Sequence, residues 1–117
     1  MTHSALQIPF QVTDWNIHSS EEHPGETGTS WWKTVQYPGL RIRQVIYSKN
    51  YKADHWCRKG HLVFCIAGAF TSEMEDGTEV ILREGMSYHV SDELSSHRSH
   101  TTEGATLLII DGDFLKS

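Results

Sequence analysis

The chain has 117 residues, which suits one small domain and is too short for two ordinary hydrophobic cores. Acidic residues outnumber basic ones by 15 to 10, so the net charge is −5 and no basic face is available for nucleic acid or for an anionic membrane surface. The longest apolar stretch, residues 62–70, is far shorter than the about 20 residues that a membrane-spanning helix needs.

The amino-terminal sequence lacks the basic and apolar regions of a signal peptide, so we expect a cytoplasmic protein with two free thiols. Residues 8–12 predict a strand that reaches a partner surface or the edge of the main sheet. Residues 18–30 contain no large apolar side chain and predict a polar loop. The segment before this loop is too short to be a separate domain.

From Trp31 onward the pattern is typical of β-structure. Strands are predicted over residues 40–47, 62–67, 70–75, 78–82, 86–90 and 106–110. Asp76 and Gly77 form the dipeptide that favours a two-residue hairpin turn. Many short strands with regular breaks and no sustained helical period predict an all-β sandwich or barrel.

Eight histidines are the unusual feature of the composition. On an extended strand His55 and Cys57 would project to the same face, because side chains alternate along a strand. A turn at residues 58–60 could bring His61 back at the start of the next strand. Three metal donors could therefore converge, and His97 is the natural fourth donor from a distant strand.

The spacing His55-x-Cys57-x3-His61-x6-Gly68 resembles the first conserved motif of the cupins, His-x-His-x3-4-Glu-x6-Gly. Residues 85–97 resemble the second cupin motif, a glycine that opens a strand ending in a turn and a histidine. The order Asp-His-Trp-Cys at residues 54–57 also resembles a subset of compact bacterial cupins with a DHCW motif. The resemblance covers about residues 40–110.

This resemblance implies a double-stranded β-helix, the jelly-roll barrel of the cupins, over residues 31–117. Residues 1–30 would then be an N-terminal strand and polar loop of the same domain. The resemblance also implies one divalent metal ion, with the ligands His55, Cys57, His61 and His97. Imidazole and thiolate donors favour Zn, Fe, Ni or Cu over Mg or Ca.

The sequence leaves several residue roles open. If Cys57 ligates with three histidines the site is closed and structural, whereas three histidines alone leave positions open for chemistry. His100 could replace His97. We expect Cys65 in the core and His89 on the surface. Arg41, Arg43 and Arg98 could bind an anionic substrate, although a solvated barrel wall is the favoured interpretation.

The leading interpretation is a small metal-binding cupin that binds or transforms a small molecule inside its barrel. Dioxygenase-type oxidation is the first reaction class that the family resemblance suggests. One alternative is a non-catalytic ligand-binding or sensor cupin with a structural metal. Another is a metal-free barrel like the sugar isomerases and epimerases, with an acid–base pair that involves Tyr88. We also expect a homodimer, with Trp31, Trp32 and Tyr37 at the interface or on the outer wall.

Overall fold

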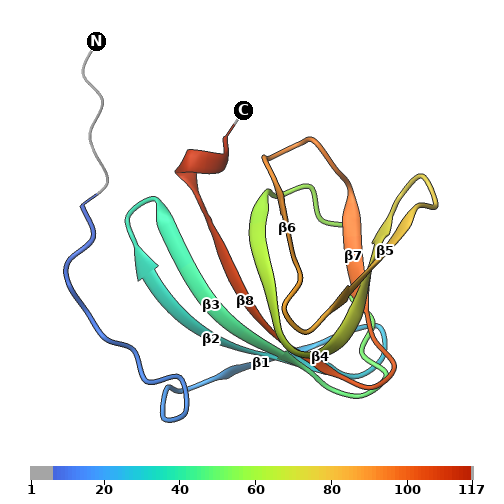
Figure 1. Cartoon of the computed structure of the whole chain (residues 1–117), viewed down its shortest axis with the longest axis horizontal. Helices are drawn as coiled ribbons and strands as arrows, with labels where there is room; N and C mark the ends of the chain where they lie inside the picture. The colour runs from blue at the N-terminus through green and yellow to red at the C-terminus, as the bar shows by residue number, and fades with distance from the viewer. Residues whose placement is uncertain (1–6, 117) are drawn as a thin grey trace.

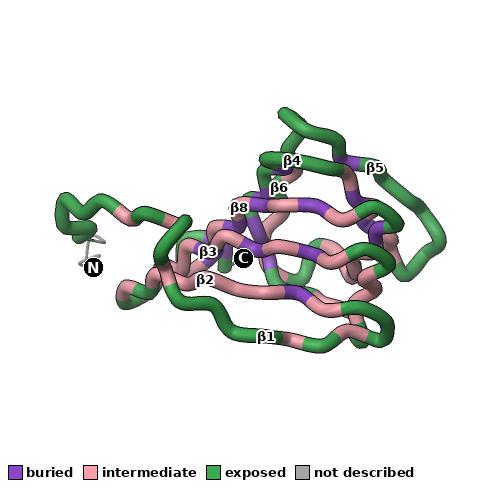
Figure 2. The backbone as a smooth tube through the Cα atoms, turned by 90° about the horizontal axis from the view of Figure 1, so that it is seen from below, coloured by how far each residue is buried: buried purple, intermediate pink, exposed green. Residues whose placement is uncertain are grey.

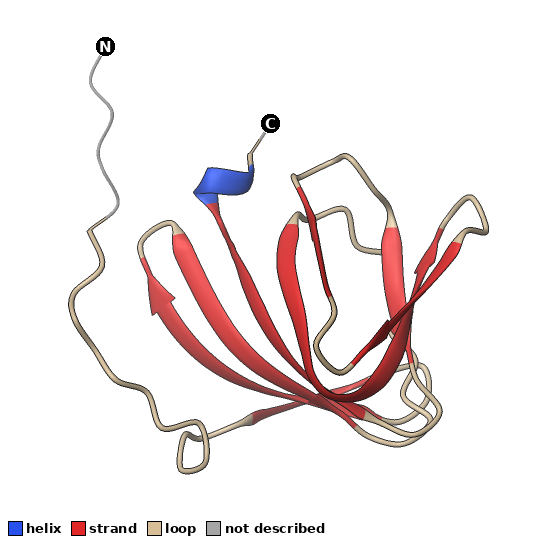
Figure 3. Cartoon of the chain, viewed as in Figure 1, coloured by secondary structure: helices blue, strands red, loops and turns tan. Residues whose placement is uncertain are grey.

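The computed structural model describes residues 7–116, and within that range it contains eight β-strands and no α-helix (Figure 3). The strands are β1 (Glu21–Pro24), β2 (Thr29–Tyr37), β3 (Leu40–Tyr47), β4 (His61–Met74), β5 (Glu79–Arg83), β6 (Ser87–Val90), β7 (His97–His100) and β8 (Ala105–Gly112). A short 3-10 helix, η1, follows at Asp113–Leu115. No helix among the described residues is long and apolar enough to cross a membrane.

Strand β4 is the element around which the sheet curls. All pairings are antiparallel, in the order β1-β2-β3-β8-β4-β5, and β6 and β7 also pair with β4. The first half of β4 pairs with β6 and β8, and its second half pairs with β5 and β7. In Figure 1, β5 and β7 consequently stand across the interior from β2 and β3. The predicted all-β jelly-roll barrel is confirmed.

Gly68 lies where β4 passes from one set of partners to the other. Its φ is +74°, and a Cβ atom there would collide with the carbonyl oxygen of Gly104. The register with β8 also shifts between Cys65 and Ala67, as in a β-bulge. The predicted strands 62–67 and 70–75 are therefore one bent strand.

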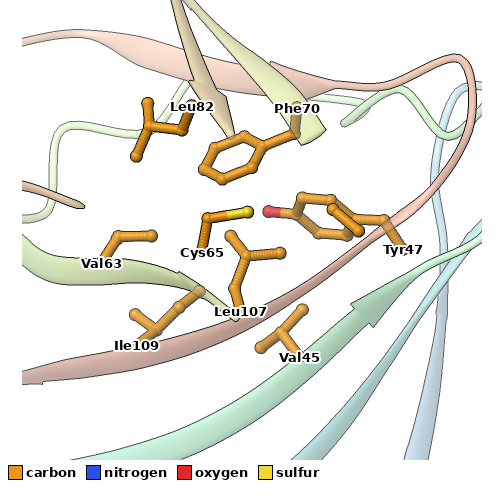
Figure 4. Packing of buried hydrophobic residues seen from close by; sticks show 9 residues of the cluster. Val45, Tyr47, Val63, Cys65, Phe70, Leu82, Leu107 and Ile109 are labelled. Atoms are coloured by element: carbon orange, nitrogen blue, oxygen red, sulfur yellow. The ribbon is translucent and has the colours of Figure 1, made fainter. Parts of the chain in front are cut away.

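The core lies inside this curl and is built from alternate residues of β3, β4 and β8. Figure 2 shows buried positions recurring along these strands, as the period of two requires. Figure 4 shows the packing of the inward side chains, including Phe70, Leu107 and Cys65. Cys65 is 0% exposed, which confirms its predicted place in the core.

The hairpin predicted at Asp76 and Gly77 joins β4 to β5. The amide of Met74 donates to the carbonyl oxygen of Thr78 at 2.7 Å, and Gly77 has a φ of +96°. This conformation is one that glycine adopts without steric cost. The other predicted strands match β3, β6 and β8 to within two residues at each end.

The N-terminal segment differs from the prediction. Residues 8–12 form no strand and pair with no strand of this chain; side chains of β2 hold the segment instead. The hydroxyl of Tyr37 donates to Oε1 of Gln11 at 2.6 Å, and Nζ of Lys33 donates to the carbonyl oxygen of Trp15 at 2.5 Å. The edge of β2 is taken by β1, which lies inside the predicted polar loop 18–30. An exposed edge strand carries few apolar side chains, so the sequence pattern did not reveal it.

Candidate metal centre

Cys57, His61 and His97 meet at one place on the barrel wall. One donor atom from each residue lies within 4.8 Å of the donor atoms of the other two. Sγ of Cys57 lies 3.7 Å from Nε2 of His61. His61 and His97 are 8% and 4% exposed, and Cys57 is half-buried. The structure thus brings together three of the four predicted ligands.

Backbone contacts fix this group. Cys57 and His97 exchange two hydrogen bonds, from N of Cys57 to O of His97 at 2.7 Å and in reverse at 3.0 Å. The amide of Gly60 donates to Oδ1 of Asp92 at 2.6 Å. A Cβ at Gly60 would meet the carbonyl oxygen of Val90 at 2.5 Å, so only glycine fits. His61 follows directly and begins β4, where pairing with β6 holds its backbone.

Both histidine rings are oriented through Nδ1. Nδ1 of His61 lies 3.0 Å from Oδ2 of Asp111, and Nδ1 of His97 lies 2.8 Å from Oγ of Ser95. These bonds leave Nε2 of each ring available to a metal ion. Metal-bound histidines in proteins are commonly held in this way by a carboxylate, a carbonyl or another polar group.

Asp111 is a functional residue that our sequence analysis missed. It is 1% exposed and ends the apolar run of β8, on the same face as Leu107 and Ile109. A carboxylate at an inward position of a barrel strand needs a buried partner. The position of Asp111 on the same face of the strand as Leu107 and Ile109 was the signal in the sequence that could have identified it.

Cys57 and His61 alter each other's protonation. Hydrogen bonds from His61 and then from His97 lower the pKa of Cys57 to about 5. Burial lowers the pKa of His61, but its bonds to Asp111 and Cys57 outweigh burial and raise the pKa overall. With a pKa of about 5 the thiol of Cys57 is ionised at neutral pH, and a metal ion would bind where the thiolate now contacts the His61 ring.

The donor chemistry fits a borderline or soft divalent cation. Two neutral imidazoles and one thiolate carry a charge of −1, so a divalent ion leaves the centre at +1. Zn²⁺ accepts this combination of nitrogen and sulfur, and Fe, Ni and Cu accept it as well. Hard ions such as Mg²⁺ and Ca²⁺ prefer oxygen donors, so they fit poorly.

His55 lies outside this group. Residues 54 and 55 form a bend rather than the predicted extended strand, so the spacing to Cys57 does not place both side chains on one face. The ring is 78% exposed, and its Nδ1 lies 2.6 Å from Oδ1 of Asp54. His55 does line the cavity beside the metal centre, and its role as a ligand stays a prediction.

His100 and His89 also lie outside the group formed by Cys57, His61 and His97. His100 is on β7 but faces Glu73 and Glu79, with Nε2 3.8 Å from a carboxylate oxygen of each. The structure therefore places His97, rather than His100, beside Cys57. His89 is exposed on β6, as predicted.

The candidate metal centre opens onto a cavity of about 280 Å³ inside the barrel. Val45, Leu107 and Ile109 supply its apolar wall, and Tyr88 lines it as well. Arg43 also lines it and is 4% exposed, so the predicted solvated position of this residue is wrong. Arg43 lies on the same face of β3 as the core residue Val45, so its side chain points into the barrel. There Asp111 compensates its charge.

No protein-family model and no curated protein sequence matches the chain. Among solved structures, an RmlC-like cupin from Shewanella frigidimarina NCIMB 400 is similar over 92% of this chain and 94% of its own, with a TM-score of 0.71 and 17% identity. The chain has the cupin fold. A cupin-like protein from Thermotoga maritima is similar over 82% of this chain and 80% of its own, with a TM-score of 0.69 and 15% identity.

A proposed sugar phosphate isomerase from Acidithiobacillus ferrooxidans also shares the fold, with a TM-score of 0.70 and 14% identity over 84% of this chain and 70% of its own. At these identities the likeness establishes the fold and leaves the chemistry to the site. The resemblance to the DHCW-motif cupins stays a prediction.

Proposed function

We propose that this cupin binds one divalent transition metal ion through Cys57, His61 and His97 and binds or transforms a small molecule in the adjoining cavity. The convergence of three donor atoms within 4.8 Å carries this proposal. The bonds from Asp111 and Ser95 to the two rings support it, because they orient the imidazoles before any ion binds. His55, at the cavity wall, stays the predicted fourth ligand, and its binding would close a tetrahedral site.

Three protein ligands suit a catalytic ion, because a tetrahedral ion then keeps one position for a ligand. When bound, the ion would supply an open coordination position; for dioxygenase-type oxidation, in which O2 is the oxidant, it would have to be a redox-active ion such as Fe(II) or Cu. Tyr88 lines the same cavity, with its ring centroid 6.1 Å from that of His97. Burial and the nearby Tyr47 raise the pKa of Tyr88, so its hydroxyl stays protonated and can donate to the bound molecule.

A second candidate is metal-free acid–base chemistry by Tyr88 and His97, as in a sugar isomerase or epimerase. The common cavity of these two residues favours it, and one structural neighbour is a proposed sugar phosphate isomerase. A third candidate is a sensor in which His55 closes the metal site and no reaction follows. The metal content separates the second candidate from the other two.

The decisive experiment is metal analysis of protein purified without an affinity tag, before and after anaerobic reconstitution with Zn, Fe(II), Ni or Cu. We expect about one ion per chain. His61→Ala and His97→Ala should each lose the ion, while His89→Ala, an exposed histidine, serves as the matched control. Failure of the wild type to retain any of the four ions would leave the acid–base candidate or plain ligand binding.

We further propose that the protein is a homodimer. Leu62, Phe64 and Ile66 on the outer face of β4 are 38%, 44% and 38% exposed, and such contiguous apolar surface is typical of an interface. Trp32 is not part of this surface, since it lines the cavity. Light scattering should give a dimer mass at micromolar concentration and a monomer mass for Phe64→Glu. A monomeric wild type would refute the dimer.

A further inference from the structure

The lining of the cavity beside the candidate metal centre is rich in cationic side chains. Four cationic side chains line it, and no aspartate or glutamate among the described residues does. They are Arg41, Arg43, Lys59 and Arg98. The chain as a whole has a net charge of −5, so this concentration of positive charge is opposite to the average of the molecule. A site of this kind attracts anions.

Arg43 is the most buried of the four. Its guanidinium lies over the ring of Trp32, 4.4 Å from the centroid, and donates to Oδ2 of Asp111 at 3.0 Å. Its Nε is buried and has no hydrogen-bond partner in the described part of the chain. A buried N–H without a partner costs about 1–3 kcal/mol, so such groups commonly mark a place where another molecule binds.

Asp111 cannot compensate both arginines of this cluster. Arg41 donates two bonds of 3.0 Å to its carboxylate, one to each oxygen, and Arg43 donates a third. One negative charge therefore serves two positive ones. Burial and the neighbouring Arg41 lower the pKa of Arg43, although Asp111 acts in the opposite direction.

The guanidinium groups are held in fixed positions. His23 stacks on Trp32 with a centroid distance of 3.9 Å, while Arg43 also lies against this ring. Arg98 similarly lies 4.3 Å from the ring centroid of Trp56, and its guanidinium is paired with Glu73 at 3.0 Å. Because His23 and Arg43 already lie against the Trp32 ring, the group that can anchor a ligand is the guanidinium of Arg43 and not the tryptophan ring. Such fixed forks match the planar or branched geometry of oxyanions.

We propose that the molecule bound in this cavity is a small organic anion whose oxyanion group, a carboxylate or a phosphoryl group, accepts hydrogen bonds from Arg43. The inference rests on the proposed function in assigning the cavity to a small-molecule ligand. Arg43 and His61 both bond to Oδ2 of Asp111, so an oxyanion on Arg43 would place the rest of the ligand next to the metal centre.

The test is isothermal titration of metal-free protein with malonate and, separately, with inorganic phosphate, with malonamide as the neutral control. We expect saturable binding of at least one anion, none of malonamide, and at least tenfold weaker anion binding by Arg43→Gln. Arg83→Gln, which changes an exposed arginine on β5, is the matched control and should bind as the wild type does. The preferred probe tells a carboxylate ligand from a phosphoryl ligand.

Binding of malonamide as strong as that of malonate would overturn the inference, as would an equal loss in Arg83→Gln or no binding of either anion. If Arg43→Gln does not fold, Arg43→Lys keeps the charge without the fork, and Arg98→Gln removes a half-exposed cation; each should weaken binding several-fold. Zinc uptake is measured separately, on aliquots of the same preparations that have been reconstituted with zinc. Zinc uptake without anion binding defeats this inference alone, and anion binding without uptake of any metal defeats the proposed metal site alone.

Discussion

Oδ2 of Asp111 lies 3.0 Å from Nδ1 of His61, so the last strand of the barrel holds the imidazole that begins β4. Burial raises the pKa of Asp111, but the hydrogen bonds from His61 and Arg41 outweigh burial. The pKa of this carboxyl group therefore lies well below its usual range. The same oxygen accepts a bond from Arg43. One carboxylate therefore orients a proposed metal ligand and compensates the cationic cavity wall.

Asp111→Asn should weaken zinc affinity by about 10–100-fold, because the amide orients the His61 ring less firmly. It should also lower the free energy of unfolding by about 3–5 kcal/mol, since Arg43 would stay buried without its counter-charge. Chelator competition and urea unfolding measure the two effects. Asp113→Asn removes an exposed carboxylate that pairs with Lys116, and it should change neither quantity. Equal effects of the two variants would contradict the role given to Asp111.

His55→Ala should weaken zinc affinity by about tenfold, clearly less than His61→Ala, because His55 must leave Asp54 before it can reach an ion. Asp54→Ala frees the ring and should strengthen zinc binding or leave it unchanged. Zinc titration of the three variants measures these differences. If His55→Ala binds zinc as the wild type does, the centre has three protein ligands and His55 is not one of them.

In metal-free protein, Cys57 should react with iodoacetamide at a nearly constant rate from about pH 6.5 to 8.5, because its pKa of about 5 keeps it ionised throughout this range. The rate should fall only as the pH drops through that value. Cys65 is 0% exposed and burial raises its pKa, so it should remain unmodified. Peptide mass spectrometry reports both sites. Zinc should protect Cys57, and a Cys57 rate that climbs tenfold per pH unit would mark an ordinary thiol.

Gly68→Ala should destabilise the fold by about 2–5 kcal/mol, because it adds a collision with the backbone of Gly104 to the strain of a positive φ. Gly77→Ala is the control, since Gly77 also has a positive φ but no atom within 4 Å of an added Cβ. Its cost should be only about 1–2 kcal/mol. Thermal unfolding of both variants gives the comparison. Similar losses of stability in the two variants would show that the close approach of the Gly104 backbone to Gly68 adds nothing to the cost of the substitution.

Several features follow from local patterns, and these were predictable from the residues alone. Alternation over residues 40–47 places β3 within its observed bounds, and the Asp76-Gly77 dipeptide places the hairpin. Both signals act between near neighbours in the chain, where side-chain period and turn chemistry suffice. The order of His61, Gly68 and His97 likewise indicated the barrel through its resemblance to known motifs.

The composition of the site followed from contacts between distant segments. A bend at residues 54–55 turns His55 away from Cys57, while backbone bonds with β7 bring His97 to it. Asp111 and Arg43 meet because β3 and β8 pair in one register and both side chains point inward. Strand alternation can say that two residues share a face, but which face encloses the cavity depends on how the whole sheet curls.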